Sequence, residues 1–511
     1  LNSVIGEGLI KEIDIPVIDI FPNYLGKNWK HYYIFQSNPS EFVIKPILEE
    51  SAKLREDGER RHPDSSEKKE CKVVSVNGDK CFPEALSVQI SGQNIPAGII
   101  FIPKNDAIDN VPHDIKRVVG IDFGTTNTNI YIQDNDELAK KWEFDFREHF
   151  FKITNSSDQA RNQLLDKYFF PNKKVKFPTP TAIRIFDLTA DRRLSMDYFA
   201  YFMDDFVIPS NVYTNIKWEE VSQNEQTTKQ RKYFKSLLFL VLLDAASKSK
   251  TEGKNRVQEL KLWISFPKVF SQTELIEFRA AWKSSLQELI FGDYSTIIVF
   301  EEDAIGNSGI KIKGLRAGDQ EDVLRYETEG RASGEYFASD KMMLGDKASS
   351  HAACVCFDVG GGTTDISIWG GDNEMVSDSS VLLAGRHITQ MFHKNNNLRS
   401  VLFSSDIVTK FDVVKGDFDK FASVLNHALK AMDIKNILPT NAGNKEVKWL
   451  RKMIMLEFGA IAYYTAMVAY ASSKNDPDAQ IVNRLQNRRF KCYWGGNAAQ
   501  YIHWLDSGTF Q

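Results

Sequence analysis

Two segments that share one pattern constrain the fold of this chain more than any other feature of its sequence. The first runs from Arg117 to Ile132 and contains Gly-Ile-Asp-Phe-Gly-Thr-Thr-Asn; the second runs from Cys354 to Trp369 and contains Asp-Val-Gly-Gly-Gly-Thr-Thr-Asp. In each, an apolar run reaches an aspartate, glycine and threonine follow, and the chain becomes apolar again. This pattern predicts two strands joined by a tight turn.

These turns have the chemistry of a phosphate site. Backbone N–H groups and hydroxyls at such a turn bind phosphate oxygens, and a carboxylate at the strand end holds magnesium through its water shell. Two such hairpins facing each other would clamp the phosphates of one nucleotide from both sides. The sequence has neither the G-x-x-x-x-G-K-[ST] phosphate loop nor the G-x-G-x-x-G dinucleotide fingerprint, so we predict a nucleotide site of a different design.

A third glycine-rich segment comes near the end of the sequence. The run Tyr493-Trp-Gly-Gly496 ends an apolar strand pattern, and Asn497 follows at what the sequence predicts to be a helix start. A glycine pair at such a place lets a flat base or ribose lie against the backbone.

The chain changes character near residue 116. Before it, short apolar runs separated by turns such as Asn77-Gly78 and Ser91-Gly92 predict a small β-rich unit, in which the charged run from Arg55 to Glu70 is a solvated loop. From Arg117 onward, strand patterns alternate with helices. One of these helices opens at the capping box Ser271-Gln-Thr-Glu274.

Composition excludes several classes of protein. Lys+Arg 64 against Asp+Glu 68 gives a net charge of −4, which argues against a chain built to coat nucleic acid or an anionic membrane. The apolar stretches at 236–246 and 456–471 are shorter than the ~20 residues that a bilayer requires, so we expect no membrane insertion. Five cysteines without C-x-x-C spacing, and no visible leader, indicate reduced thiols of a cytoplasmic protein. Pairing of Cys71 with Cys81 is the alternative for an oxidising compartment.

The first glycine segment, from Gly120 to Asn127, resembles the first phosphate loop of the actin, sugar-kinase and heat-shock protein 70 ATPase superfamily. The second, from Asp358 to Asp365, is similar to its second loop in the triple-glycine form typical of the heat-shock protein 70 branch. Similar segments continue in the same order: Phe177–Phe186, Trp263–Pro267, Phe300–Ala304 at the Glu-Pro-x-Ala helix start, Leu383–Gly385 and Tyr493–Gly496 at the adenosine motif. The resemblance covers about 117–511.

The resemblance implies a role for each matching residue. Asp122 and Asp358 would position magnesium through water, Glu301 would lie near the attacking water, and Lys217 is the best counterpart of the chaperone's catalytic lysine. The residues implied to contact ATP or ADP are Gly124, Thr125, Thr126, Asn127, Gly360, Gly361, Gly362, Thr363, Gly385, Gly495, Gly496 and Asn497.

The resemblance also implies a fold and a function. We expect an α/β, two-lobed actin-like ATPase fold with ribonuclease H-like lobes. It would comprise a β-rich accessory domain at 1–116, lobe I at 117–350 with an insertion at about 307–350, and lobe II at 351–511. The leading hypothesis is a heat-shock protein 70-like switch that binds ATP, hydrolyses it slowly and acts on a protein client or partner. The alternatives are an actin-like polymerising ATPase, a small-molecule kinase and a non-catalytic nucleotide-binding adaptor.

Overall fold

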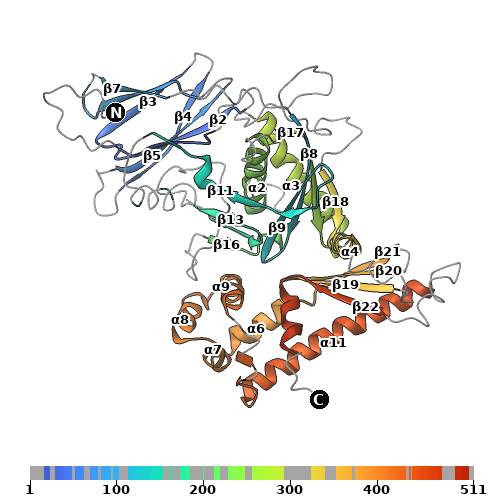
Figure 1. Cartoon of the computed structure of the whole chain (residues 1–511). Helices are drawn as coiled ribbons and strands as arrows, with labels where there is room; N and C mark the ends of the chain where they lie inside the picture. The colour runs from blue at the N-terminus through green and yellow to red at the C-terminus, as the bar shows by residue number, and fades with distance from the viewer. Residues whose placement is uncertain are drawn as a thin grey trace.

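The structure is a computed structural model of the whole chain. It describes residues 16–23, 29–48, 52–61, 69–78, 82–93, 96–102, 113–153, 159, 165, 173–184, 200, 212–218, 228–247, 256–292, 324–339, 353–370, 375–432, 437–438, 440–474 and 490–505. Cys81 and Glu301, both named in the sequence predictions, lie outside these residues. Figure 1 shows a β-rich N-terminal part, a central α/β part and a C-terminal α/β part.

The N-terminal part consists of two antiparallel sheets. Its strands are β1 (Ile18–Phe21), β2 (His31–Ser37), β3 (Phe42–Ile47), β4 (Lys53–Arg61), β5 (Lys69–Asn77), β6 (Ala85–Ile90) and β7 (Pro96–Phe101). One sheet has the order β12-β1-β2-β5-β4 and the other β3-β6-β7. The prediction of a loop from Arg55 was therefore wrong in its first residues, because they belong to β4. This strand lies at the edge of its sheet. Charged residues are common on edge strands since they oppose pairing with other chains.

Lobe I is built on a sheet with the order β10-β9-β8-β17-β18. Its strands are β8 (His113–Phe123), β9 (Asn127–Asp134), β10 (Lys140–Lys141), β17 (Arg256–Phe266) and β18 (Leu324–Thr328), and its two long helices are α2 (Lys229–Ala246) and α3 (Gln272–Phe291). Strands β8, β9 and β10 are antiparallel neighbours, whereas β17 pairs parallel with β8. The predicted capping box at the start of α3 is confirmed.

Lobe II repeats this topology with the order β21-β20-β19-β22. Its strands are β19 (Ala353–Val359), β20 (Thr364–Gly370), β21 (Met375–Val381) and β22 (Phe490–Gly495), and its helices include α6 (Arg386–Lys394), α7 (Asn396–Leu402), α8 (Ser405–Val414), α9 (Phe418–Ala431) and α11 (Lys445–Lys474). The first three strands are again antiparallel neighbours, and the fourth pairs parallel with the first. The predicted two-lobed α/β architecture is therefore confirmed.

Part of the predicted insertion at 307–350 belongs to the core of the fold. Strand β18 extends the lobe I sheet parallel to β17, and helix α4 (Glu329–Ser339) packs against β19 and β20 of lobe II. The segment lacks an apolar period because α4 approaches its sheet through small residues. A Cβ on Gly334 would lie 2.1 Å from Nε1 of Trp369, and one on Gly330 would lie 3.2 Å from the carbonyl oxygen of Ile366.

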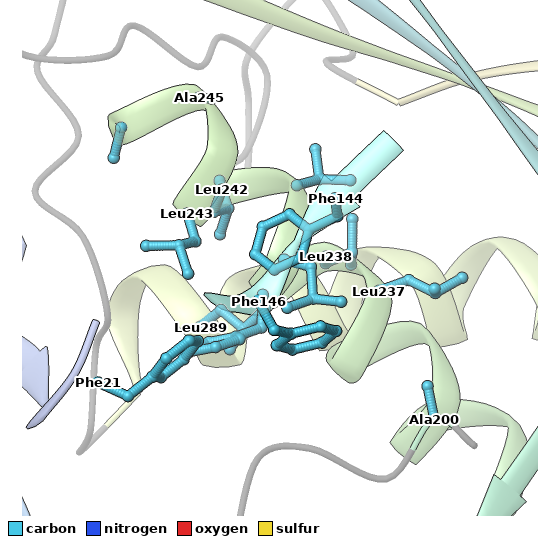
Figure 2. Packing of buried hydrophobic residues seen from close by; sticks show 14 of the residues in the cluster. Phe21, Phe144, Phe146, Ala200, Leu237, Leu238, Leu242, Leu243, Ala245 and Leu289 are labelled. Atoms are coloured by element: carbon cyan, nitrogen blue, oxygen red, sulfur yellow. The ribbon is translucent and has the colours of Figure 1, made fainter. Parts of the chain in front are cut away.

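The N-terminal part and lobe I share one hydrophobic core. Phe21 of β1 packs against Phe146 and Phe150, and Trp29 packs against Phe239 of α2 with ring centroids 5.7 Å apart. Figure 2 shows Phe21 close to Phe146 and to the leucines of α2. Strand β12 (Phe151–Lys152) comes after the first lobe I strands in the chain, and it also pairs with β1. The β-rich part is thus continuous with lobe I in both its sheet and its core.

The apolar part of helix α11 is longer than the sequence prediction about membranes assumed. Its stretch Lys445–Ser472 is long and apolar enough to cross a membrane by length and composition, with a mean hydropathy of 1.3 in an 18-residue window. The sequence prediction considered only the shorter run at 456–471, whereas the helix continues on both sides of it. One face of α11 packs into lobe II, where Ile454, Phe458 and Ile461 are buried.

Replacing Phe239 with alanine tests the shared core. Phe239 of α2 is fully buried against Phe21, Trp29 and Tyr33 of the N-terminal part, so we expect Phe239→Ala to lower the free energy of unfolding by about 3–5 kcal/mol. Because the core is continuous, lobe I and the N-terminal part should unfold in one shifted transition in denaturant, followed by fluorescence and circular dichroism. The half-exposed Phe291→Ala control should change stability by less than about 0.5 kcal/mol. Two separate transitions, with only one of them shifted, would contradict the shared core.

Glu457 of α11 gives the stability a defined pH dependence. Burial raises its pKa from 4.5 to about 8, so the folded state keeps a proton that the unfolded state releases between these two values. The free energy of unfolding therefore falls as pH rises through this window and levels off above it. Glu457→Gln should remove this fall, so that its melting temperature exceeds that of wild type at pH 9 by more than at pH 5. The half-exposed Glu288→Gln serves as the control, and an equal offset at both pH values would rule out the buried neutral carboxyl.

Candidate functional site

The two predicted phosphate loops face each other between the lobes. Residues 124–126 join β8 to β9, and residues 360–363 join β19 to β20. A Cβ on Gly361 would lie 2.1 Å from Oγ1 of Thr126, and one on Gly362 would lie 2.8 Å from Oγ1 of Thr125. Glycine at these positions is therefore what allows the loops to approach each other this closely.

A cavity of about 250 Å³ lies at this junction, lined by residues of both loops. The residues of the sequence prediction that line it are Asp122, Gly124, Thr125, Thr126, Asn127, Lys217, Asp358, Gly360, Gly361, Thr363, Gly496 and Asn497. The structure thus brings together side chains from the start, the middle and the end of the α/β region.

The first loop is held from behind by a chain of hydroxyl groups. Tyr233 of α2 donates a hydrogen bond to Oγ1 of Thr128 at 2.9 Å, and Thr128 contacts Oγ1 of Thr181 at 2.9 Å. Thr181 in turn donates to the carbonyl oxygen of Gly124 at 2.8 Å. Nε1 of Trp218 donates to Oγ1 of Thr125 at 2.8 Å from the other side. These bonds fix the loop conformation before any ligand binds.

Asp122 comes at the end of β8 and is supported by two polar neighbours. Its Oδ2 accepts a hydrogen bond from Nδ2 of Asn129 at 3.3 Å, and its Oδ1 accepts one from Oγ of Ser265 at 3.1 Å. Burial raises the pKa of Asp122, and these two hydrogen bonds only partly oppose that rise. The carboxyl group is therefore held in place in surroundings that disfavour its charge.

Asp358 occupies the equivalent place at the end of β19 in lobe II. Its Oδ2 accepts a hydrogen bond from Oγ of Ser333 on α4 at 2.8 Å. Burial, together with the charges of Asp122 and Glu329, raises the pKa of Asp358 to about 7. The two strand-end aspartates are thus close enough for each to disfavour the charge of the other.

Lys217 is an interior residue that forms a buried ion pair with Glu329. Its Nζ lies 2.5 Å from Oε1 of Glu329, and the two side chains are 1% and 9% exposed. Burial opposes the charge of Lys217, but Glu329 and Asp122 outweigh that effect and raise its pKa. Both members of the pair line the cavity.

Sequence reasoning missed Glu329 and chose Glu301, which lies outside the described residues. Glu329 is the first residue of α4 and follows β18 directly. A signal was present, because Glu329-Gly-Arg-Ala332 places a carboxylate three residues before an alanine, as Glu301 to Ala304 does. Glu301 was chosen because its segment resembles the Glu-Pro-x-Ala helix start of the family, and its role stays a prediction.

The donor set of the cavity suits a divalent cation held through its water shell. Asp365 is buried, and burial and the charge of Glu329 raise its pKa well above its ordinary value. Its Oδ1 has no hydrogen-bond partner among the described residues. Four carboxyl groups, those of Asp122, Glu329, Asp358 and Asp365, therefore gather around one lysine. Glu329 and Asp365 are buried, whereas Asp122 and Asp358 are partly exposed to the cavity. Within the described ranges, no three His, Cys, Asp or Glu side chains converge to hold a metal ion directly.

A second, smaller hollow of about 50 Å³ adjoins the loops on the side of lobe II. Gly385 lines it, and the N–H of Gly385 donates to the carbonyl oxygen of Gly360 at 3.1 Å. Sequence reasoning did not identify Arg386 and Asp419, which also line it and form an ion pair at 3.1 Å.

The glycine pair at the end of β22 packs against Asp358. Gly496 has φ +84°, and a Cβ on it would lie 2.4 Å from Oδ1 of Asp358. Gly495 pairs with Asp358 in the sheet and lines neither hollow, whereas Gly496 lines the cavity. These glycines let β22 lie close against the aspartate, and the role of the pair as a surface for a base stays a prediction.

Breaking the buried ion pair should strongly destabilise the fold. Lys217→Met leaves Glu329 and Asp122 without their buried counter-charge, so we expect the free energy of unfolding to fall by about 3–5 kcal/mol. The partly exposed pair Lys235–Glu288 is the matched control, and Lys235→Met should cost less than about 1 kcal/mol. Denaturant unfolding of both variants measures the difference. Equal losses would show that Lys217 does not neutralise the site.

Comparisons with known proteins found similar structures only. No protein-family model matches the chain, and no curated protein matches it. Among solved structures, MreB5 of Spiroplasma citri bound to ADP shares 13% identity with a TM-score of 0.29, covering 56% of this chain and 57% of that one. The same protein bound to AMPPNP shares 12% identity with a TM-score of 0.34, and the match covers 77% of this chain and 95% of that one. A ParM filament structure from Clostridium botulinum shares 13% identity with a TM-score of 0.32, and the match covers 76% of this chain and 98% of that one.

The first of these alignments spans little more than half the length of its MreB5 chain. Superpositions with TM-scores this low support no argument about function. The assignment of a two-lobed α/β fold rests instead on the repeated strand order of the two sheets and on the paired loops between them.

Proposed function

We propose that this protein binds Mg²⁺-ATP between its two lobes, hydrolyses it slowly and uses the resulting lobe movement as a switch, as in heat-shock protein 70. The observation that carries the proposal is the convergence of both glycine loops, the two strand-end aspartates and Lys217 on one cavity. A site with this shape and this excess of carboxyl groups suits a ligand that brings both phosphates and a divalent cation.

Each group has a distinct task in this proposal. Bound Mg²⁺-ATP supplies the phosphoryl group and the cation that neutralises it. The loop N–H groups and the hydroxyls of Thr125 and Thr363 bind phosphate oxygens, and Asp122 and Asp358 hold the water shell of the cation. Phosphoryl transfer depends mainly on such positioning and charge neutralisation.

Lys217 and Glu329 form the remaining pair of the site. Lys217 carries positive charge to the place where phosphate oxygens would gather, and its buried stem fixes its position. Glu329 offers an acceptor that can orient a water molecule and hold its proton at Oε1 or Oε2. The same carboxylate replaces solvent as the counter-charge of the lysine, so a ligand anion would compete with Glu329 for Nζ.

The polar contacts between the lobes suit a switch. Nδ2 of Asn426 on α9 lies 3.3 Å from Oδ1 of Asn127, and Oγ1 of Thr328 donates to Asp378 at 3.0 Å. Lys268 also forms an ion pair with Asp378. Single hydrogen bonds of this kind contribute about 1 kcal/mol each, so differential binding of ATP and ADP has enough free energy to open or close them.

Isothermal titration calorimetry with Mg²⁺-ATP tests the proposal. Wild type should bind, and Asp358→Ala combined with Gly361→Val should abolish binding because it removes one cation-binding carboxylate and fills the space beside Thr126. The control is Gly416→Val, since a Cβ on Gly416 meets no atom within 4 Å. Chelation of magnesium should weaken ATP binding to wild type at least about tenfold. No binding by wild type, or equal binding by the double variant, would refute the assignment.

Turnover and assembly separate the switch from the other functions. Binding without hydrolysis indicates a non-catalytic adaptor, and ADP release that rises with an added metabolite indicates a kinase. Nucleotide-driven self-assembly is the second candidate, and the ParM filament among the structural neighbours makes it worth a direct test. Sedimentation with and without Mg²⁺-ATP provides that test: a chain that pellets only with ATP is a polymerising ATPase, whereas one that stays monomeric is not.

A further inference from the structure

Helix α11 presents large apolar side chains to solvent along most of its length. The exposed ones are Trp449, Met455, Leu456, Tyr463, Tyr464, Met467 and Tyr470. Leu456 and Tyr463 in the middle of the helix are 67% and 70% exposed. The opposite face is also apolar and is buried in lobe II. A surface helix of a soluble domain normally turns polar residues outward, so this exposed face requires a separate explanation.

The exposed side chains form one continuous stripe. Trp449, Leu456, Tyr463 and Tyr470 follow one another at intervals of seven residues, which keeps them on one side of the helix. At 1.5 Å per residue the stripe is roughly 32 Å long. Small exposed residues lie between the large ones, including Gly459 and Ala460, so the large side chains stand out from the surface.

The fully exposed charges on the described part of this helix are all positive. Lys445, Lys448, Lys452 and Lys474 are exposed. Of the two acidic residues of the helix, Glu457 is buried and Glu446 accepts a hydrogen bond from Asn395. The exposed face of α11 is therefore cationic as well as apolar, although the whole chain carries a net charge of −4.

Three of these lysines lie together at the N-terminal end of the stripe. Lys445, Lys448 and Lys452 line an open hollow of about 680 Å³ with Trp449. The half-buried Glu446 also lines this hollow, so three lysines there oppose one carboxylate. A group of lysines beside an exposed tryptophan suits the headgroup region of an anionic bilayer, where ammonium groups meet lipid phosphates and aromatic rings lie at the interface.

The position of α11 in the fold leaves this face accessible. Figure 1 shows α11 along the outer side of lobe II, with the lobe II sheet between it and α4, and lobe I beyond α4. The contacts agree, because α11 packs on β20 and β21 from one side and α4 packs on them from the other. An extended surface could therefore meet α11 without approaching the cavity between the lobes.

We infer that the exposed face of α11 docks lengthwise on an anionic lipid surface, with Lys445, Lys448 and Lys452 among the headgroups and the aromatic stripe at the acyl boundary. Helices of this kind lie in the plane of the interface. Spanning does not fit, because the inner face of α11 is packed into lobe II. A second copy of the chain fits less well, since two such faces would bring lysines together in either orientation. The inference does not rest on the nucleotide site.

Flotation of the full chain with vesicles tests the inference in the absence of nucleotide. The protein should float with vesicles of phosphatidylcholine and phosphatidylglycerol at low salt, and should not float with phosphatidylcholine alone. Lys445→Gln/Lys448→Gln/Lys452→Gln should weaken the partitioning roughly 100-fold, as each basic residue near an anionic surface contributes about a fivefold gain. Leu456→Glu/Tyr463→Glu should abolish it by placing carboxylates in the apolar stripe.

Matched variants elsewhere on the surface serve as controls. Lys140→Gln/Lys174→Gln/Lys176→Gln removes the same charge from exposed lysines of lobe I, and Leu138→Glu changes a leucine that is 92% exposed. Both should float like wild type. All variants should keep the wild-type melting temperature, because every substituted side chain faces solvent.

Three results would overturn the inference. The first is no flotation of wild type with anionic vesicles, and the second is equal flotation of the α11 variants and the controls. The third is a dimer of wild type without lipid, seen by light scattering and lost in Leu456→Glu/Tyr463→Glu, which would assign the face to a second copy of the chain.

Discussion

The close approach of two hairpin turns is the constraint on which the arrangement of this protein depends. Gly361 leaves no room for a Cβ against Thr126, so the ends of β8 and β19 must meet at one place between the lobes. Each turn belongs to a sheet with the same strand order, so the two turns occupy equivalent places in their sheets. The hydroxyl chain from Tyr233 to Gly124 then fixes the first turn against α2.

This approach buries more negative charge than the site can neutralise. Four carboxyl groups gather around Lys217, and burial raises the pKa of Asp122, Asp358 and Asp365. Such an arrangement costs stability, because buried charges are unfavourable without partners. Because the fold keeps these unfavourable carboxyl groups at a cavity, the arrangement suits the binding of a charged ligand and does not increase stability. A cation with phosphates would supply the missing positive charge and use the N–H groups that the turns expose.

Local pattern predicted much of this arrangement, and tertiary context decided the rest. The aspartates at the strand ends and the glycine turns follow from short apolar runs and turn residues, so they were readable. Glu329 was missed because its place at the cavity depends on the pairing of β18 with β17, which joins segments far apart in sequence. The β-rich part was predicted as a separate unit because sequence pattern does not show contacts between distant residues. The packing of Trp29 against Phe239, which joins this part to lobe I, is such a contact.

Whole-chain charge is a poor guide to a single helix, as α11 shows. A net charge of −4 argues against an anionic surface as partner, yet the fully exposed charges on the described part of α11 are all lysines. The same lobe II sheet carries α4 on one face and α11 on the other. Helix α4 supplies Ser333 to Asp358 and begins with Glu329, so a lobe movement that follows the nucleotide would move α11 with it. The cavity and the exposed stripe of α11 thus lie on opposite sides of one sheet, because α4 and α11 pack on the same strands.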